Sequence, residues 1–263
     1  MNNLSIIKIG GNIVDDATKL AAFLKDFVAL QGAKILVHGG GKVATKIGAQ
    51  LGIASKYVDG RRITDAATID LVTMVYAGLI NKKMVAALQS MDCNALGVTG
   101  ADANLVPAIK RAVKEIDYGF VGDVKSEQLH TQTWQVLLDI GLVPIVAPIT
   151  HDAQGQLLNT NADTMAQEIA KALSKFYNVS LVYSFEKAGV LLDVNDDASV
   201  VKQLGSNYYQ QLKTEGKIFA GMIPKLDNAF AAIAAGVSRV IIGHAEALPA
   251  LTNGTAGTTI TNE

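Results

Sequence analysis

The chain has 263 residues, of which 49% are hydrophobic, 18% charged and 6% aromatic, with 23 basic and 24 acidic side chains. A chain of this length can bury a large core, either as one α/β domain or as two lobes. The net charge of −1 supplies no basic surface for nucleic acid or an anionic membrane. We therefore expect neither as a partner.

The cysteine content and the start of the chain indicate the compartment. A single cysteine, Cys93, excludes an internal disulfide and fits a reducing environment. The start Met1–Leu4 leads into a strand pattern without the features of a signal peptide. No apolar run approaches the roughly 20 residues of a membrane helix. These features predict a cytoplasmic protein.

The stretch Ile6–Asn12 combines a strand pattern with phosphate-binding chemistry. Lys8 lies inside a short apolar run, which ends on Gly10 and Gly11. A buried lysine is costly unless it meets an anion, and paired glycines let backbone N–H groups approach a ligand closely. We expect a phosphate site here. The alternative is an edge strand whose lysine extends to water.

The next elements alternate between helix and strand. We expect a helix over residues 16–30, a strand over 34–38 and a helix over 43–51. Strand–helix–strand succession predicts a mostly parallel sheet, in which ligands bind beyond the carboxyl ends of the strands. Gly40 and Gly41, which follow the second strand, lie at that edge together with the first glycine turn.

Two common glycine-rich motifs are absent. Ala44 stands where G-x-G-x-x-G requires its third glycine, and Val43 follows Gly41-Lys42 where the P-loop requires Ser or Thr. A standard Rossmann dehydrogenase and a Walker-type ATPase are therefore disfavoured.

The middle of the chain contains an arginine pair and a long apolar helix. Arg62 lies in a short strand within residues 57–65, and arginine can bind a carboxylate through two hydrogen bonds, although solvation alone is the alternative. The helix expected over 66–91 is apolar on nearly every side. We expect it to be buried on all sides, in the core or in a subunit interface. Short strands and hairpins, with a lid as one possibility, are expected over 105–131.

The remaining pattern continues the α/β alternation. Strands are expected over 95–98, 143–147, 179–184 and 238–243, and helices over 133–140, 162–175 and 221–235. We divide the chain into an N-terminal lobe, residues 1–175, and a C-terminal lobe, residues 176–263. The lobes should share one continuous sheet.

Polar residues at the strand ends favour phosphoryl transfer. Lys8 and Lys225 could neutralise charge on a moving phosphoryl group. Asp163 could lie between the two lysines and reduce their repulsion. Its alternative role is an ordinary helix cap.

The sequence offers no convincing general base, because its histidines (His38, His130, His151 and His244) are scattered. A carboxylate acceptor needs none, since its pKa near ~4 leaves it ionised at neutral pH. The chemistry therefore favours a kinase that forms an acyl phosphate. No cluster of Cys, His or carboxylates predicts a protein-held metal, so we expect Mg²⁺ to arrive with ATP.

Five motifs, in order and at matching separations, resemble the amino acid kinase family. The resemblance extends from Ile6 to Ile260 and is carried by Lys8–Gly11, His38–Gly41, Gly60–Thr64, Asn159–Asp163 and Gly221–Lys225. It implies a three-layer α-β-α sandwich around a mostly parallel open central sheet, as in carbamate kinase.

Within that family the chain is similar to members of arginine biosynthesis that use ATP to phosphorylate the side-chain carboxylate of N-acetyl-L-glutamate or another N-acylglutamate. The resemblance implies that Lys8 and Lys225 stabilise the phosphoryl group and that Asp163 organises them. Gly10 and Gly11 would donate N–H groups toward ATP. The implied acylglutamate-binding residues, on the N-terminal lobe, are Gly40, Gly41, Arg62 and Asn159. The implied ATP-binding residues on the C-terminal lobe are Glu186, Lys187, Ala188, Gly189, Val190, Leu191, Lys217, Ile218 and Phe219.

Some positions depart from the family pattern. Glu186 stands where Asp is usual, and Phe120 stands where His is common, in the part expected to cover the acyl group. These departures leave the identity of the acyl group on the substrate undecided, with acetyl as the default and a larger acid such as succinyl as the alternative. The long apolar helix resembles the family's dimer-forming helix. Because Lys8 comes so early, we expect a homodimer that arginine does not inhibit.

Other functions remain as alternatives. Glutamate 5-kinase, aspartokinase and carbamate kinase belong to the same family, but the Asn159–Asp163 motif and the absence of appended domains argue against them. A non-catalytic nucleotide- or effector-binding regulator on the same fold is disfavoured because both Lys8 and Lys225 are present.

Overall fold

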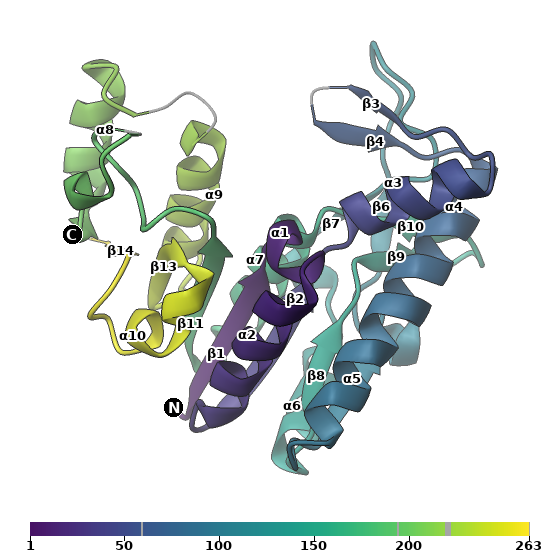
Figure 1. The fold of residues 1–263 in the computed structure, drawn as a ribbon, viewed down its shortest axis with the longest axis horizontal. Helices are drawn as coiled ribbons and strands as arrows, with labels where there is room; N and C mark the ends of the chain where they lie inside the picture. Colours follow the sequence, from purple (N-terminus) through teal and green to yellow (C-terminus); the bar gives the residue numbers. More distant parts are fainter. Residues whose placement is uncertain (59, 194, 219–221, 263) are drawn as a thin grey trace.

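An eight-stranded sheet organises the chain (Figure 1). The computed structural model describes residues 1–58, 60–193, 195–218 and 222–262. Neighbouring strands of the sheet are parallel except β13 and β14, which are antiparallel. In spatial order the strands are β12 (Gln203–Leu204), β14 (Thr258–Ile260), β13 (Arg239–His244), β11 (Asn178–Phe185), β1 (Asn3–Ile9), β2 (Ala33–His38), β8 (Val143–Val146) and β5 (Ala95–Val98).

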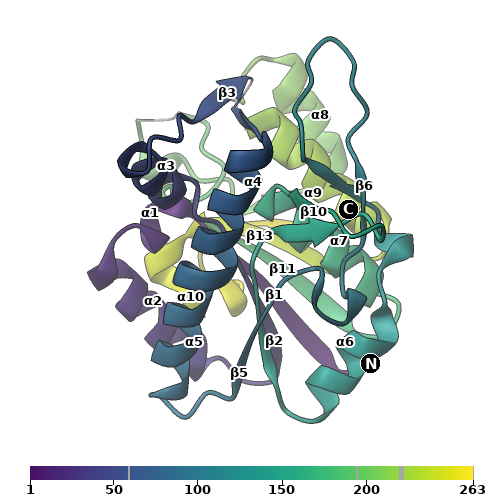
Figure 2. The same cartoon turned by 90° about the vertical axis from the view of Figure 1, so that its right-hand side faces the viewer.

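Helices cover both faces of this sheet (Figure 2). One face packs against α2 (Ala17–Ala29), the continuous helix α4 (Ala66–Thr73), η1 (Met74–Ile80) and α5 (Asn81–Gln89), and α10 (Leu248–Thr252). The other packs against α6 (Thr131–Asp139), α7 (Ala162–Leu173) and α9 (Ile223–Ala234). The predicted three-layer sandwich around a mostly parallel sheet is confirmed.

The alternation of side chains in β1 explains how one strand serves two cores. Leu4 and Ile6 belong to the cluster beneath α7, whereas Ile7 and Ile9 belong to the cluster beneath α2. A strand covered on both faces is therefore apolar almost throughout. Lys8 shares the face of Ile6, because alternate residues point to the same side of a sheet. Its side chain thus lies on the α7 face, near the carboxyl end of the strand.

Small elements complete the fold. Three antiparallel pairs stand outside the main sheet: β3 (Lys56–Val58) with β4 (Arg61–Ile63), β6 (Ala108–Lys110) with β7 (Gly122–Val124), and β9 (Ile149–His151) with β10 (Leu157–Asn159). The other helices are α1 (Gly11–Val14), α3 (Gly41–Gln50), α8 (Ser206–Thr214) and the 3-10 turns η2 (Asp102–Asn104), η3 (Ser126–Gln128), η4 (Asp197–Ser199) and η6 (Ala245–Ala247).

Most predicted elements are confirmed within a few residues, including the hairpin strands between 105 and 131. The short helices α1 and α10 were not predicted, because four or five residues are too few to establish a helical period. Asp59 and Gly221, which belong to predicted stretches, lie outside the described residues.

The long helix is less buried than the sequence suggests. Its middle segment, η1, is a π-helix, and within the described chain Met74 is 56% and Leu79 is 38% exposed. Burial on all sides within the core of one chain is therefore wrong, and burial in a subunit interface stays a prediction. One flank of the helix packs on the sheet through Leu71, Val72 and Met84, while the other presents apolar side chains to solvent.

The same helix meets a length and composition test for crossing a membrane. It spans 24 residues, Ala66–Gln89, and 44% of its most apolar window is buried in the fold. The expectation that no apolar run approaches membrane length is wrong by this measure. A core helix passes the same test, and here the helix contributes much of one hydrophobic core.

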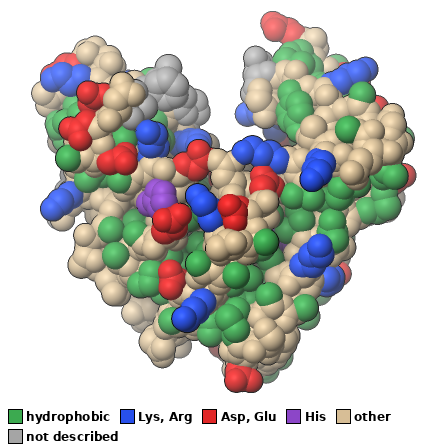
Figure 3. All heavy atoms as spheres, viewed as in Figure 1, with side chains coloured by type: hydrophobic (Ala, Val, Ile, Leu, Met, Phe, Trp, Pro, Cys, Tyr) green, Lys and Arg blue, Asp and Glu red, His purple; other side chains and the backbone are tan. Residues whose placement is uncertain are grey.

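The two parts of the chain occupy opposite ends of the sheet. Strands from residues 3–146 form one end and strands from residues 178–260 the other, so the predicted continuous sheet is confirmed. Figure 3 shows the molecule hollowed between the part that carries α8 and α9 and the part that carries β3 and β4. The predicted lobe boundary at residues 175 and 176 falls between α7 and β11 and stays a prediction.

A buried histidine ties the sheet to the long helix. His38 ends β2 and is fully buried. Its Nδ1 lies 2.8 Å from the Gly39 carbonyl oxygen, and Asn81 Nδ2 lies 3.2 Å from its Nε2 and 2.8 Å from the Ile145 carbonyl oxygen. These contacts place the proton on Nδ1, so that Nε2 accepts. Burial lowers the pKa of His38 from 6.5 to about 4.

This histidine should make stability depend on pH. Between pH 6.5 and about 4 the unfolded chain binds a proton at His38 that the folded chain does not. The free energy of unfolding therefore decreases as the pH is lowered through this window. The contribution of neutral His38 to the free energy of unfolding is fully present above pH 6.5. It decreases by about 3 kcal/mol as the pH is lowered to about 4. Urea unfolding at a series of pH values measures it.

His38→Gln should flatten this pH dependence, whereas His130→Gln, at an exposed position, should not. An equal slope in wild type and His38→Gln would contradict the assignment.

Candidate active site

Lys8 and Asp163 form an ion pair where the central strand meets α7. Lys8 Nζ lies 2.7 Å from Asp163 Oδ1, and the two side chains are 11% and 30% exposed. The helix cap is Asn161, whose side chain accepts from the backbone N–H groups of Asp163 and Thr164. Because Asn161 satisfies those donors, the Asp163 carboxylate pairs with Lys8 and does not cap α7.

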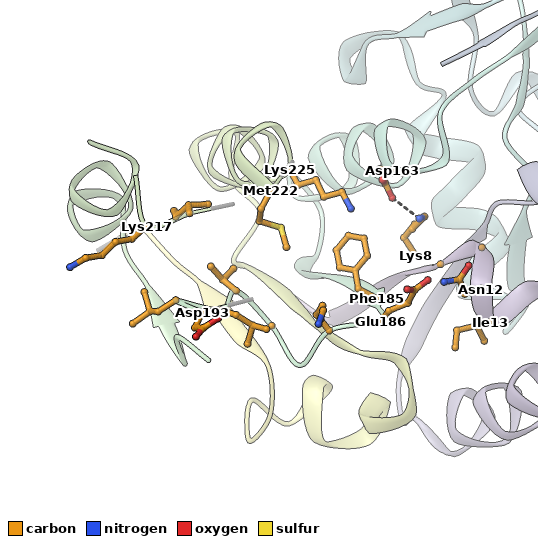
Figure 4. Close-up of a pocket in the computed structure, with 18 of the residues that line it drawn as sticks. Lys8, Asn12, Ile13, Asp163, Phe185, Glu186, Asp193, Lys217, Met222 and Lys225 are labelled. Carbon is orange, nitrogen blue, oxygen red and sulfur yellow. Dashed lines mark ion pairs between the residues drawn. The ribbon is translucent and has the colours of Figure 1, made fainter. Parts of the chain in front are cut away.

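Lys225 approaches the same point from the other part of the chain. It lies in the first turn of α9, and its Nζ is 3.9 Å from the centre of the Phe185 ring. Lys8 Nζ is 5.8 Å from that same centre. Figure 4 shows the two lysine side chains pointing toward the Asp163 carboxylate, with the Phe185 ring below them.

The electrostatics of Lys225 follow from this placement. Burial lowers its pKa, the Asp163 carboxylate opposes that change, and the nearby Lys8 charge lowers the pKa further. Two ammonium groups therefore share one carboxylate. The arrangement directs both ammonium groups, together with the carboxylates of Asp163 and Glu186, to one end of a cavity.

A cavity of about 940 Å³ opens beside these residues. Its lining includes most of the positions predicted for ATP and catalysis: Lys8, Gly10, Gly11, Asp163, Glu186, Lys187, Gly189, Val190, Leu191, Lys217, Ile218 and Lys225. Ala188 is not among the lining residues, and Phe219 lies outside the described residues. The structure thus brings both lysines and the predicted C-terminal segments to one cavity.

Several lining residues of the large cavity were not predicted: Asn12, Ile13, Phe185, Leu192, Asp193, Gly216 and Met222. Asn12 and Ile13 directly follow the first glycine pair, and Phe185 directly precedes Glu186. Their position in the sequence next to predicted residues is the feature that could have identified them as lining residues.

Gly189 fixes the course of the segment that follows β11. A Cβ added there would lie 2.5 Å from Val200 and 2.6 Å from Thr258 Oγ1. The same hydroxyl accepts a 2.8 Å hydrogen bond from the backbone N–H of Val190. A side chain at this position would push the segment away from β14, so glycine is required for this wall of the cavity.

A second cavity of about 210 Å³ lies beside the second glycine turn. Gly40, Gly41, Arg62 and Asn159, which were predicted to bind substrate, all line it. Arg62 is buried, and its Nη2 donates to the Gly41 carbonyl at 2.8 Å and to Thr45 Oγ1 at 2.9 Å. Its guanidinium has no carboxylate partner among the described residues. It is therefore placed to bind the carboxylate of a ligand.

The second cavity is also lined by residues that were not predicted to bind substrate, several of which lie within the motifs His38–Gly41, Gly60–Thr64 and Asn159–Asp163. They are Gly39, Tyr57, Gly60, Arg61, Tyr76, Arg111, Val121, Pro148, Thr160, Asn161 and Ala162. Tyr76 comes from η1, and a Cβ added at Gly40 would collide with it and with Ile80. Both Gly40 and the helix were predicted from the sequence, but the packing of the helix against this glycine was not.

The two cavities suit a reaction between an anion and a phosphate chain. Gly10 and Gly11 line one cavity and Gly40 and Gly41 the other. No histidine contributes to either lining as described, so an acceptor that must lose a proton finds no imidazole base there. An ionised carboxylate acceptor needs none.

Comparison with known proteins agrees with this architecture. Residues 3–244 match the sequence profile of the amino acid kinase family. The chain is 58% identical to "Acetylglutamate kinase" of Cytophaga hutchinsonii, over 96% of each chain, and 57% identical to "Acetylglutamate kinase" of Bacteroides fragilis, over 93% of each. The crystal structure of carbamate kinase from Giardia lamblia bound to AMP-PNP has the same fold, with a TM-score of 0.72 at 15% identity over 100% of this chain and 99% of that one. The profile match and these identities together show that the chain belongs to the amino acid kinase family.

Proposed function

We propose that this chain transfers the γ-phosphoryl group of ATP to the side-chain carboxylate of N-acetyl-L-glutamate or a related N-acylglutamate, in arginine biosynthesis. The observation that carries the proposal is the meeting of Lys8, Asp163 and Lys225 in the lining of the large cavity, together with a second cavity that is lined by Arg62. Relatives named acetylglutamate kinase, at 57% and 58% identity, support the same assignment.

The reaction balances without a proton-transfer step. An oxygen of the substrate's side-chain carboxylate attacks the γ-phosphorus, a new P–O bond forms, and the bond to the oxygen bridging the β- and γ-phosphates breaks. ADP leaves with that oxygen, and the product is an acyl phosphate. The acceptor is already ionised at neutral pH, since an ordinary carboxyl has a pKa near ~4.

The chain's contribution is positioning and charge neutralisation. Lys8 and Lys225 face the phosphoryl group, and Asp163 holds their ammonium groups together against mutual repulsion. N–H groups of the two glycine turns donate to phosphoryl and carboxylate oxygens. Arg62, with Asn159 beside it, holds the substrate α-carboxylate away from the reacting end.

We propose that Mg²⁺ enters with ATP. It prefers oxygen ligands, keeps several waters and is commonly held by one or two carboxylates together with phosphates. The lining of the large cavity supplies the carboxylates of Asp163 and Glu186 at its lysine end. When bound, the ion would neutralise phosphate charge that the two lysines leave uncompensated.

We also propose a cytoplasmic homodimer in which residues 1–175 bind acylglutamate and form the interface and residues 176–263 bind ATP. The exposed apolar flank of the long helix, with Met74 and Leu79, supports self-association, because monomers seldom expose such a surface.

Removing Lys225 should damage chemistry more than binding. Lys225→Ala should lower kcat by about 100- to 1,000-fold, because it removes a charge aimed at the developing transition state. ATP affinity should change by less than about tenfold, since adenosine contacts remain. Initial rates and calorimetric titration separate the two effects.

The matched control for Lys225→Ala is Lys213→Ala, which removes a lysine paired with Asp227 outside the cavity. Lys225→Ala with wild-type turnover would favour a non-catalytic regulator.

Asp163→Asn should alter the pH dependence of the rate. The Asp163 carboxylate raises the pKa of Lys225, so its loss should lower that pKa further. The alkaline limb of kcat/KM should then move to lower pH, because the ammonium form is lost earlier. Asp227→Asn, whose carboxylate pairs with Lys213, should leave the limb in place. Superimposable profiles for wild type and Asp163→Asn would contradict the shared-carboxylate arrangement.

A coupled assay of ADP release tests the proposed reaction itself. N-acetylglutamate, N-succinylglutamate, free glutamate and carbamate are supplied in parallel with ATP and Mg²⁺. We expect turnover with at least one N-acylglutamate and much less with free glutamate, which lacks the acyl group. Turnover only with free glutamate or carbamate would reject the assignment.

A further inference from the structure

The second, smaller cavity is lined by more arginines than N-acetylglutamate requires. Its lining contains Arg61, Arg62 and Arg111 and, among the described residues, no Asp or Glu. N-acetylglutamate has two carboxylates: the side-chain carboxylate accepts the phosphoryl group beside Lys8, and the α-carboxylate belongs to Arg62. Its acetyl group is uncharged. Under the proposed function, Arg61 and Arg111 therefore have no group of N-acetylglutamate to bind, although Asp123, which does not line the cavity, pairs with Arg111.

Arg111 is the remaining arginine whose orientation is fixed. Its Nε donates to both Asp123 oxygens, at 3.0 and 3.3 Å, and its Nη2 donates to Asp123 Oδ1. Its guanidinium carbon lies 5.4 Å from the centre of the Tyr118 ring, and its backbone N–H donates to the Val121 carbonyl. Nη1 has no partner among the described residues. An arginine held on one edge by a carboxylate is preorganised to bind a second carboxylate on another edge.

The other two arginines are less suited to this task. Arg61 is exposed on β4, and its side chain makes no hydrogen bond or ion pair among the described residues. Arg62 already donates to Gly41 and Thr45 and is the arginine for the α-carboxylate. Arg111 lines the cavity together with Val121 and Asn159, on the side formed by the β6–β7 hairpin and the start of α7.

We propose that Arg111 binds a carboxylate at the far end of the acyl group, so that the preferred substrate is an N-acylglutamate with a dicarboxylic acyl chain of the succinyl class. Succinyl extends beyond the acetyl methyl carbon by one methylene and a carboxylate, which is the group that the open Nη1 edge of Arg111 can bind. This inference rests on the proposed acylglutamate phosphorylation and names the substrate class of that site.

A purely structural role for Arg111 makes a different prediction. In that case the ion pair with Asp123 only holds the β6–β7 hairpin, and a partly exposed pair of this kind contributes little stability. Removing either partner would then have the same effect. If Arg111 binds substrate, only the loss of the cation abolishes recognition of the acyl carboxylate.

The experiment measures kcat/KM of the full chain for three substrates with ATP and Mg²⁺. These are N-acetylglutamate, N-succinylglutamate and N-succinamoylglutamate, in which an uncharged amide replaces the terminal carboxylate. Wild type should prefer succinyl over succinamoyl by about 10- to 100-fold, the size expected for one charge-assisted pair. The wild-type kcat/KM for N-succinylglutamate should also exceed that for N-acetylglutamate.

Variants then locate the recognition. Arg111→Met and Arg111→Gln should bring the succinyl and succinamoyl values within about threefold of each other. Asp123→Asn breaks the same ion pair but keeps the cation, so it should retain most of the preference. Lys110→Met removes a cation on the same hairpin that does not line the cavity, and should also retain it. ATP binding by each variant confirms folding.

Several results would overturn the inference. The first is an equal wild-type kcat/KM for the succinyl and succinamoyl substrates. The second is a loss of the succinyl preference in Asp123→Asn that is as complete as in Arg111→Met. The third is a loss of that preference in Arg61→Met while Arg111→Met retains it. Turnover of N-acetylglutamate without any succinyl preference would reject this inference and leave the proposed function intact. Failure with every N-acylglutamate, alongside turnover of free glutamate or carbamate, would reject both.

Discussion

The candidate site depends on a carboxylate shared between two ammonium groups. Lys8 Nζ lies 2.7 Å from Asp163 Oδ1, and Lys225 points to the same carboxylate from α9. Two lysines this close would repel each other, and burial alone lowers the pKa of Lys225. Asp163 offsets that repulsion and keeps both side chains directed at one point. This geometry suits the phosphoryl group of the proposed reaction, which two ammonium groups could contact together.

The fold produces this meeting from parts distant in sequence. Lys8 comes from the central strand β1, which pairs with β2 from the N-terminal part and with β11 from the C-terminal part. The Asn161 cap sets the start of α7, and therefore the position of Asp163 over β1. Because β1 and β2 are parallel and end together, the glycine turns that follow them lie at the same edge of the sheet. The core thus positions both cavities before any ligand arrives.

The sequence predicted the fold well because its strands are buried on both faces and its motifs fall at strand ends. Lys8, Gly10 and Gly40 were recognisable from spacing, and Asp163 from its place after an Asx-rich turn. The exposed flank of the long helix could not be predicted, because the sequence of an apolar helix does not indicate which side packs on a sheet. Phe185, Tyr76 and Arg111 also escaped detection. Each enters its cavity only through tertiary packing or a hairpin pairing that local patterns do not encode.

The most direct measurement is a crystal structure of this chain with ADP, Mg²⁺, tetrafluoroaluminate and an N-acylglutamate, in which the fluoride complex mimics the phosphoryl group in transit. We expect Lys8 Nζ and Lys225 Nζ each to lie at hydrogen-bond distance, about 2.7–3.2 Å, from the fluoride complex, with Asp163 between them. A complex in which either ammonium group faces away from the fluorides, with the substrate carboxylate in line for attack, would contradict the account.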